Sequence, residues 1–127
     1  MSAMKVVAFG IKSHPESMRE FAAAFEAVQK GREIAGPKEA VYFTSLAAVR
    51  NFLTPKRLAL LKLVKKQNPK SIYALAKSAG RSFPSVLKDV ELLSRYGLLK
   101  LTKDKNSPRN SVQARVSYDA IHLYVGV

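Results

Sequence analysis

The stretch from residue 71 to residue 101 constrains the fold most, because two short helical patterns meet there across one tight turn. The first pattern opens after a capping Ser71, and its apolar residues recur at helical spacing: Ile72, Leu75, Ala76 and Ala79. The second pattern follows Gly80-Arg81-Ser82 and ends at Gly97. Its apolar stripe consists of Val86, Val90, Leu93 and Tyr96. This order, with an apolar strand-like run directly afterwards, predicts a helix-turn-helix followed by a β-wing. Such an arrangement exposes the second helix to the major groove of DNA.

The residues after Gly97 predict a hairpin with an exposed tip. Residues 98–102 and 112–118 alternate or run apolar enough to pair as strands. Residues 103–111 between them are polar, basic and rich in turn formers, as expected of a wing tip. Residues 120–127 predict a final strand.

The segments before residue 71 predict an arm and two further helices. Residues 4–11 are rich in strand formers, residues 16–30 carry a helical apolar stripe, and residues 40–43 are extended. A short helix is expected over 46–53, and another begins at Thr54-Pro55 and ends at Asn68-Pro69. We therefore predict an α+β fold, in which residues 44–127 form a winged helix-turn-helix domain. Residues 1–43 form an N-terminal strand-helix-strand arm that contacts a second subunit or a partner.

The net charge of +13 is distributed unevenly along the chain. Residues 1–43 contain six Lys or Arg and five Asp or Glu, whereas residues 44–127 contain sixteen and four. The excess therefore lies in the part that carries the helix-turn-helix pattern, which favours a polyanionic partner such as nucleic acid. The alternative is a solvated basic surface that serves solubility.

Composition excludes several other classes of function. The chain has no Cys and two His, and its nine Asp and Glu are dispersed, so neither a metal site nor a cofactor is expected. No phosphate-binding glycine loop or nucleophile motif is present, and we do not expect an enzyme. No apolar run approaches the ~20 residues of a membrane span, and the N-terminus lacks the order of a signal peptide. A reducing cytoplasm is the expected location.

The candidate DNA-binding residues follow from the predicted faces of the two helices and the wing. They are Tyr73, Lys77, Arg81, Ser82, Ser85, Lys88, Asp89, Lys103, Lys105 and Arg109. Arg81 and Lys88 are expected to reach phosphates or guanine edges, and the short serines let the helix approach closely. Asp89 is expected either to pair with a neighbouring arginine or to accept from a cytosine amine. The alternative for the whole set is that these are ordinary exposed residues. Phe83 either packs under the turn or touches a thymine methyl, and the first is favoured.

Four strings carry a resemblance to a known family: F-T-S-L at 43–46, L-A-K-S-A-G-R-S at 75–82, L-L-S-R-Y-G-L-L at 92–99 and Y-D-A-I at 118–121. Residues 41–123 resemble small MarR-like winged helix-turn-helix proteins that are predicted transcriptional regulators. Relatives generally carry polar residues after the turn, where this chain has Phe83-Pro84. The resemblance implies a repressor. Because some relatives are thought to be antitoxins encoded beside a small toxin, it also implies a cognate toxin as a partner.

Three functions remain open from the sequence. The first is a homodimeric regulator that reads symmetric half-sites of double-stranded DNA. The second is a protein-interaction module that docks a toxin or another partner without reading DNA. RNA binding is the third, and it has less support because the chain lacks an aromatic-rich sheet on which bases could stack.

Overall fold

The computed structural model describes residues 5–11, 19, 21–23, 25–26, 41–103 and 111–125. The chain divides into two compact units: unit 1 is Met1–Leu53 with Tyr118–Val127, and unit 2 is Thr54–Ser117. This division differs from the expected boundary after residue 43, because the short helix over 46–53 and the last strand both belong to unit 1. The helix-turn-helix and the wing lie within unit 2.

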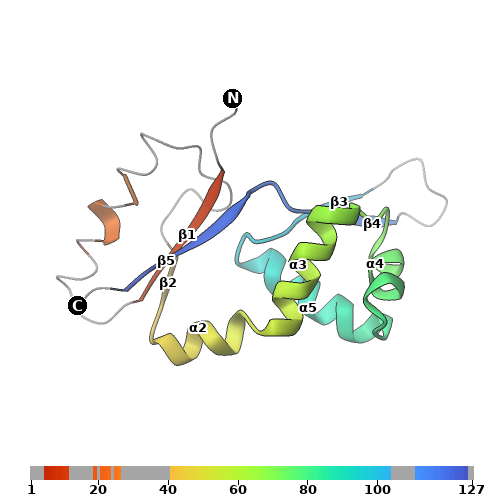
Figure 1. The fold of residues 1–127 in the computed structure, drawn as a ribbon, viewed down its shortest axis with the longest axis horizontal. Helices are drawn as coiled ribbons and strands as arrows, with labels where there is room; N and C mark the ends of the chain where they lie inside the picture. Colours follow the sequence, from red (N-terminus) through yellow and green to blue (C-terminus); the bar gives the residue numbers. More distant parts are fainter. Residues whose placement is uncertain are drawn as a thin grey trace. The chain divides into compact units, whose positions relative to one another are not determined.

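Unit 1 contains a three-stranded parallel sheet in the order β2-β1-β5 (Figure 1). Its strands are β1 (Val6–Ile11), β2 (Val41–Phe43) and β5 (Ala120–Tyr124). Val6 pairs with Ala120 at one end of the β1–β5 ladder, and Phe9 pairs with Val41 on the other side of β1. Five of the six β1 residues are buried, as expected for the central strand of a parallel sheet. The final strand expected from the sequence is therefore present, but its partner is the first strand of the chain.

Aromatic side chains build the core of unit 1. The ring of Phe9 lies 5.5 Å from that of Phe43 and 6.3 Å from that of Phe52, which is on α2 (Leu46–Phe52). Phe21 is helical in this structure and packs against β1 at Gly10, the only residue type that leaves room for the ring there. These edge-to-face contacts join α2 and the sheet into one core.

Unit 2 contains three helices and a two-stranded wing (Figure 1). The helices are α3 (Pro55–Gln67), α4 (Ile72–Ala79) and α5 (Phe83–Arg95). Each begins at a hydroxyl side chain that accepts a hydrogen bond from a backbone N–H of its first turn, namely Thr54, Ser71 and Ser82. The three caps and the ends of the helices confirm the pattern expected from the sequence. The core is formed by apolar residues from all three helices: Leu60, Leu61, Val64, Ile72, Leu75, Val86, Val90 and Leu93.

The wing consists of β3 (Lys100–Lys103) and β4 (Val112–Arg115), which pair antiparallel. Leu98 and Leu99 precede β3 and are buried, so they anchor the hairpin to the unit 2 core. The side-chain amide of Gln113 also donates a hydrogen bond of 3.1 Å to the carbonyl of Pro69, in the loop between α3 and α4. The wing predicted from the sequence is therefore confirmed, and it is held to the helical part of unit 2 both through the residues before β3 and through β4.

None of the helices in the described part of the chain combines the length and apolar character that a membrane span requires.

Candidate nucleic-acid interface

The turn between α4 and α5 is defined by Gly80, which has a left-handed φ of 66°. The amide of Arg81 donates to the carbonyl of Ala76 at 3.1 Å, and the amide of Gly80 donates to Lys77 at 3.2 Å. This pair of bonds is a Schellman motif, which satisfies the last carbonyls of α4 and ends the helix at Gly80. The side chain of Ser82 then accepts from the amide of Ser85 at 3.3 Å and starts α5. The sequence Gly80-Arg81-Ser82 thus fixes the point where the second helix begins.

The inner side of α5 is fully buried at Val86, Val90 and Leu93. Residues on the opposite side of the helix are exposed, and the charged ones are Lys88, Glu91 and Arg95. Glu91 and Arg95 were not among the residues expected from the sequence. They follow Lys88 at spacings of three and seven, so helical periodicity alone was enough to find them.

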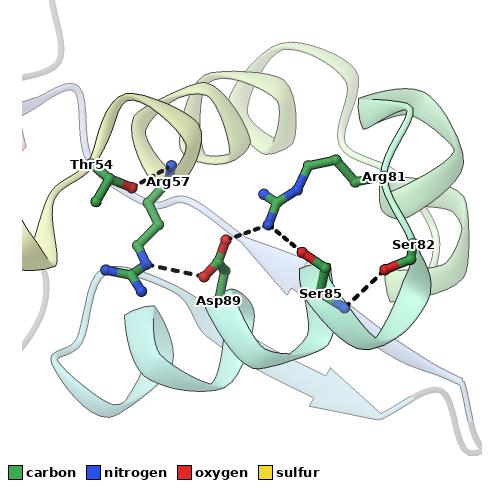
Figure 2. Close-up of polar contacts among 6 residues, drawn as sticks. All are labelled: Thr54, Arg57, Arg81, Ser82, Ser85 and Asp89. Atoms are coloured by element: carbon green, nitrogen blue, oxygen red, sulfur yellow. Dashed lines mark hydrogen bonds and ion pairs between the residues drawn. The ribbon is translucent and has the colours of Figure 1, made fainter.

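A carboxylate between two guanidinium groups holds α5 against the rest of unit 2 (Figure 2). One oxygen of Asp89 lies 3.1 Å from Nε of Arg57 on α3, and the other lies 2.7 Å from Nη2 of Arg81 in the turn. The same nitrogen of Arg81 donates to the hydroxyl of Ser85 at 2.7 Å. We call Arg57, Arg81 and Asp89 the arginine–aspartate brace. It links α3, the turn between α4 and α5, and α5 itself.

Asp89 is only 8% exposed, so its expected place on the outer side of α5 is wrong. Position 89 is three residues after Val86 and four before Leu93, which places it at the margin of the inner stripe. Of the two roles open from the sequence, pairing with a neighbouring arginine is the one present here. Arg81, expected at phosphates or guanines, is half-buried and engaged by the brace and by Ser85.

The ionised form of Asp89 is favoured in the folded protein. Burial raises the pKa of the carboxyl, whereas the hydrogen bonds from Arg81 and Arg57 and their positive charges lower it, and the net pKa is below the ordinary value. A buried carboxylate with both oxygens engaged by guanidinium groups stays charged at neutral pH. The brace therefore remains intact there.

The other expected site residues are distributed over three elements of unit 2. Tyr73 and Lys77 are exposed on α4. Ser82 is exposed at the N-cap of α5, and Ser85 and Lys88 are exposed within that helix. Lys103 is exposed at the end of β3. Lys105 and Arg109 lie outside the described residues. Lys100 and Arg115, which pair across the wing, are two exposed cations that the sequence reasoning did not single out.

The described residues contain no group of three His, Cys, Asp or Glu side chains that could hold a metal ion.

This arrangement of α3, α4, α5 and the β3–β4 hairpin is a winged helix-turn-helix, the fold that the sequence predicted. Residues 52–123 match the model of the HVO_A0114 family, and the chain belongs to that family. No curated protein matches the sequence significantly.

Two solved structures have similar folds. NolR from Sinorhizobium fredii is 19% identical, with a TM-score of 0.50, and the alignment covers 84% of this chain and 81% of that one. The transcriptional regulator PA4135 is 16% identical, with a TM-score of 0.45 and coverage of 83% of this chain and 65% of that one. At 19% identity, the likeness to NolR establishes the fold.

Proposed function

We propose that this protein is a sequence-specific regulator that binds double-stranded DNA as a homodimer and inserts α5 into the major groove. The single observation that carries the proposal is an exposed second helix of a winged helix-turn-helix, with cations along it and on the adjoining wing. Lys88 and Arg95 lie on the outer side of α5, and Lys103 is exposed on β3. A helix of this kind fits the major groove, and cations beside it position it on the phosphates.

The charge of unit 2 supports the same proposal. Residues 54–117 contain fifteen Lys or Arg and three Asp or Glu, a net charge of +12, which is nearly all of the +13 of the chain. One of the three acids, Asp89, is neutralised within the brace. Unit 2 is therefore strongly basic, and counterion release would supply much of its affinity for a duplex.

Selection from a random duplex library, followed by competition, tests the proposal. We expect one sequence to be enriched, and this enriched duplex should compete against shuffled duplex at least 1,000-fold better at about 0.15 M salt. Two half-sites about one helical turn apart would indicate a homodimer. Equal competition by enriched and shuffled duplex would contradict specific DNA reading.

We also propose two more specific functions for the protein: repression of transcription, and autoregulation as the antitoxin of a toxin–antitoxin pair. If residues 1–43 contact a cognate toxin, the purified chain should bind a small protein encoded beside it, and the complex should retain affinity for the enriched duplex. A reporter driven by the protein's own promoter should fall in expression when the chain is supplied. Increased expression would point to an activator.

The second candidate is a protein-interaction module that uses the winged helix for docking. An exposed apolar group around Tyr73 and Phe83 favours it, because such groups are also typical of protein interfaces. This alternative predicts tight binding to a partner protein that is unaffected when Lys88 is reversed in charge.

A further inference from the structure

An apolar hollow in unit 2 is lined in part by the start of α5, the proposed DNA-reading helix. It has a volume of about 470 Å³ and lies where the start of α4, the start of α5 and the start of β4 meet. Its lining includes Ile72 and Tyr73 from α4, Phe83 and Leu87 from α5, and Val112 from β4. We call this group the apolar hollow.

Two aromatic side chains of the hollow are unusually exposed. Tyr73 is 68% exposed and Phe83 is 41% exposed. Phe83 is the first residue of α5 after its cap, and packing beneath the turn, the role favoured from the sequence, would require it to be buried. The exposed aromatic surface is therefore available to a partner rather than used by the core.

Four lysines lie close, in sequence or across the wing ladder, to residues that line the apolar hollow. Lys70 directly precedes the start of α4, and Lys77 is one turn after Tyr73 on the same helix. Lys88 follows Leu87 on α5, and Lys103 on β3 is directly opposite Val112 in the wing ladder. All four lysines are exposed. An apolar surface with lysines near it suits a partner that combines an apolar group with anionic groups.

The major groove of a duplex has this chemistry at thymine. The C5-methyl of thymine is the apolar group that the four bases present in that groove, and phosphates border the groove on both sides. We infer that the apolar hollow is a specificity site for thymine C5-methyl groups, with Phe83 and Tyr73 as the residues that read them. This inference rests on the proposed function, and it adds the base that the start of α5 recognises.

Replacement of thymine by uracil isolates the methyl group, because the two bases differ only at C5. In the enriched duplex, we expect each contacted thymine replaced by uracil to weaken binding by the wild-type chain about fourfold, the value of burying one methyl group. The Phe83→Ala and Tyr73→Ala variants should bind thymine and uracil duplexes with nearly equal affinity. Because each variant is compared with itself on two duplexes, a general loss of stability or affinity does not affect this ratio.

Leu46→Ala is the matched control, since Leu46 is an exposed apolar residue of unit 1 outside the hollow. It should keep the full preference for thymine. Equal affinity of the wild-type chain for thymine and uracil duplexes would overturn the inference, as would a preference that survives in both aromatic variants. The thymine site is also wrong if Phe83→Ala instead disrupts self-association or the binding of a partner protein without changing the thymine preference.

Failure of the inference and failure of the proposed function give different results. If a duplex is enriched but its affinity does not depend on thymine methyls, only the thymine site is wrong. If no duplex is enriched over shuffled sequence, sequence-specific DNA binding itself is wrong, and the thymine site is rejected with it.

Discussion

Asp89 accepts hydrogen bonds from arginines that come from two different segments of unit 2. Arg57 is on α3, thirty-two residues before it, and Arg81 is in the turn that sets the start of α5. A residue with these two partners determines how α5 packs against α3 and the turn before it. Its contribution to DNA binding is therefore expected to be indirect, through the position of α5.

Replacement of Asp89 by Asn should destabilise the fold by about 2 kcal/mol at neutral pH. Loss of one member of a buried ion pair costs roughly 3–5 kcal/mol, and the partial exposure of both arginines reduces that value. Urea unfolding followed by circular dichroism measures the difference. Glu91→Gln, which removes a carboxylate from the exposed side of the same helix, should change stability by less than about 0.5 kcal/mol.

The contribution of Asp89 to the free energy of unfolding should decrease as the pH falls. Because its pKa is lowered in the folded state, the carboxylate stabilises the fold above its unfolded pKa of about 3.9, and this stabilisation is lost as pH falls through the folded pKa. The free energies of unfolding of wild type and Asp89→Asn should therefore converge below about pH 4. A difference that stays constant from pH 7 to the acid limit would show that the charge of Asp89 is not what stabilises the fold.

Gly10 makes unit 1 sensitive to the addition of a single methyl group. A Cβ at this position would lie 2.6–2.9 Å from three atoms of the Phe21 ring, and that ring is almost fully buried. Gly10→Ala should destabilise the protein by about 1–3 kcal/mol through overpacking. Thermal unfolding of a double-mutant cycle checks the cause, since Phe21→Leu should cost less in the Gly10→Ala background than in the wild type. Simple additivity of the two changes would contradict the proposed clash.

At the scale of elements, each described helix of unit 2 has a start signal and a stop signal that are local in sequence. Thr54, Ser71 and Ser82 are the start signals. Gly80 and Gly97 close α4 and α5 with the same pair of backbone bonds. Because local signals of this kind act within a few residues, the bounds of these helices could be predicted from the sequence.

Replacement of Ser82 by Ala should destabilise α5 by about 1 kcal/mol, because the amide of Ser85 loses its acceptor. For a unit of this size, the midpoint of thermal unfolding should fall by about 4–8 °C. Ser78→Ala is the matched control, since Ser78 is exposed within α4 and Ala is a better helix former. An equal loss in both variants would contradict the capping role of Ser82.

The features that the sequence did not predict depend on contacts between distant residues. The pairing of β5 with β1 joins Val6 to Ala120, and no local pattern specifies which strand a final strand joins. The burial of Asp89 was missed because its partner Arg57 is on another helix and because its position is at the margin of the apolar stripe. Packing of Phe83 under the turn was favoured from the sequence, whereas 41% of this residue is exposed in the structure.

At the scale of the whole molecule, the two units differ in net charge and in the make-up of their hydrophobic cores. Unit 1 contains the parallel sheet and the aromatic core, and unit 2 contains nearly all of the excess positive charge. The proposed electrostatic attraction to a duplex would therefore come from unit 2. The arm that includes β1 and β2 remains a proposed contact for the second subunit or a partner.

Binding to the enriched duplex should weaken steeply with salt. Each phosphate neutralised contributes about −0.9 to the slope of log affinity against log salt concentration. Lys103→Gln on the wing should reduce the magnitude of this slope by about one and leave the preference for enriched over shuffled duplex unchanged. Titration at four or five salt concentrations measures both quantities, and an unchanged slope would remove Lys103 from the interface.

The central claim is that the outer side of α5 meets the duplex. Its most direct test is the affinity of Lys88→Glu and Lys62→Glu for the enriched duplex, because both change the net charge by the same amount while only Lys88 is on α5. We predict that Lys88→Glu weakens binding at least tenfold and that Lys62→Glu, on the exposed side of α3, weakens it less than about threefold at about 0.15 M salt. Equal losses in the two variants would show that only the total charge matters, and the claim for α5 would be wrong.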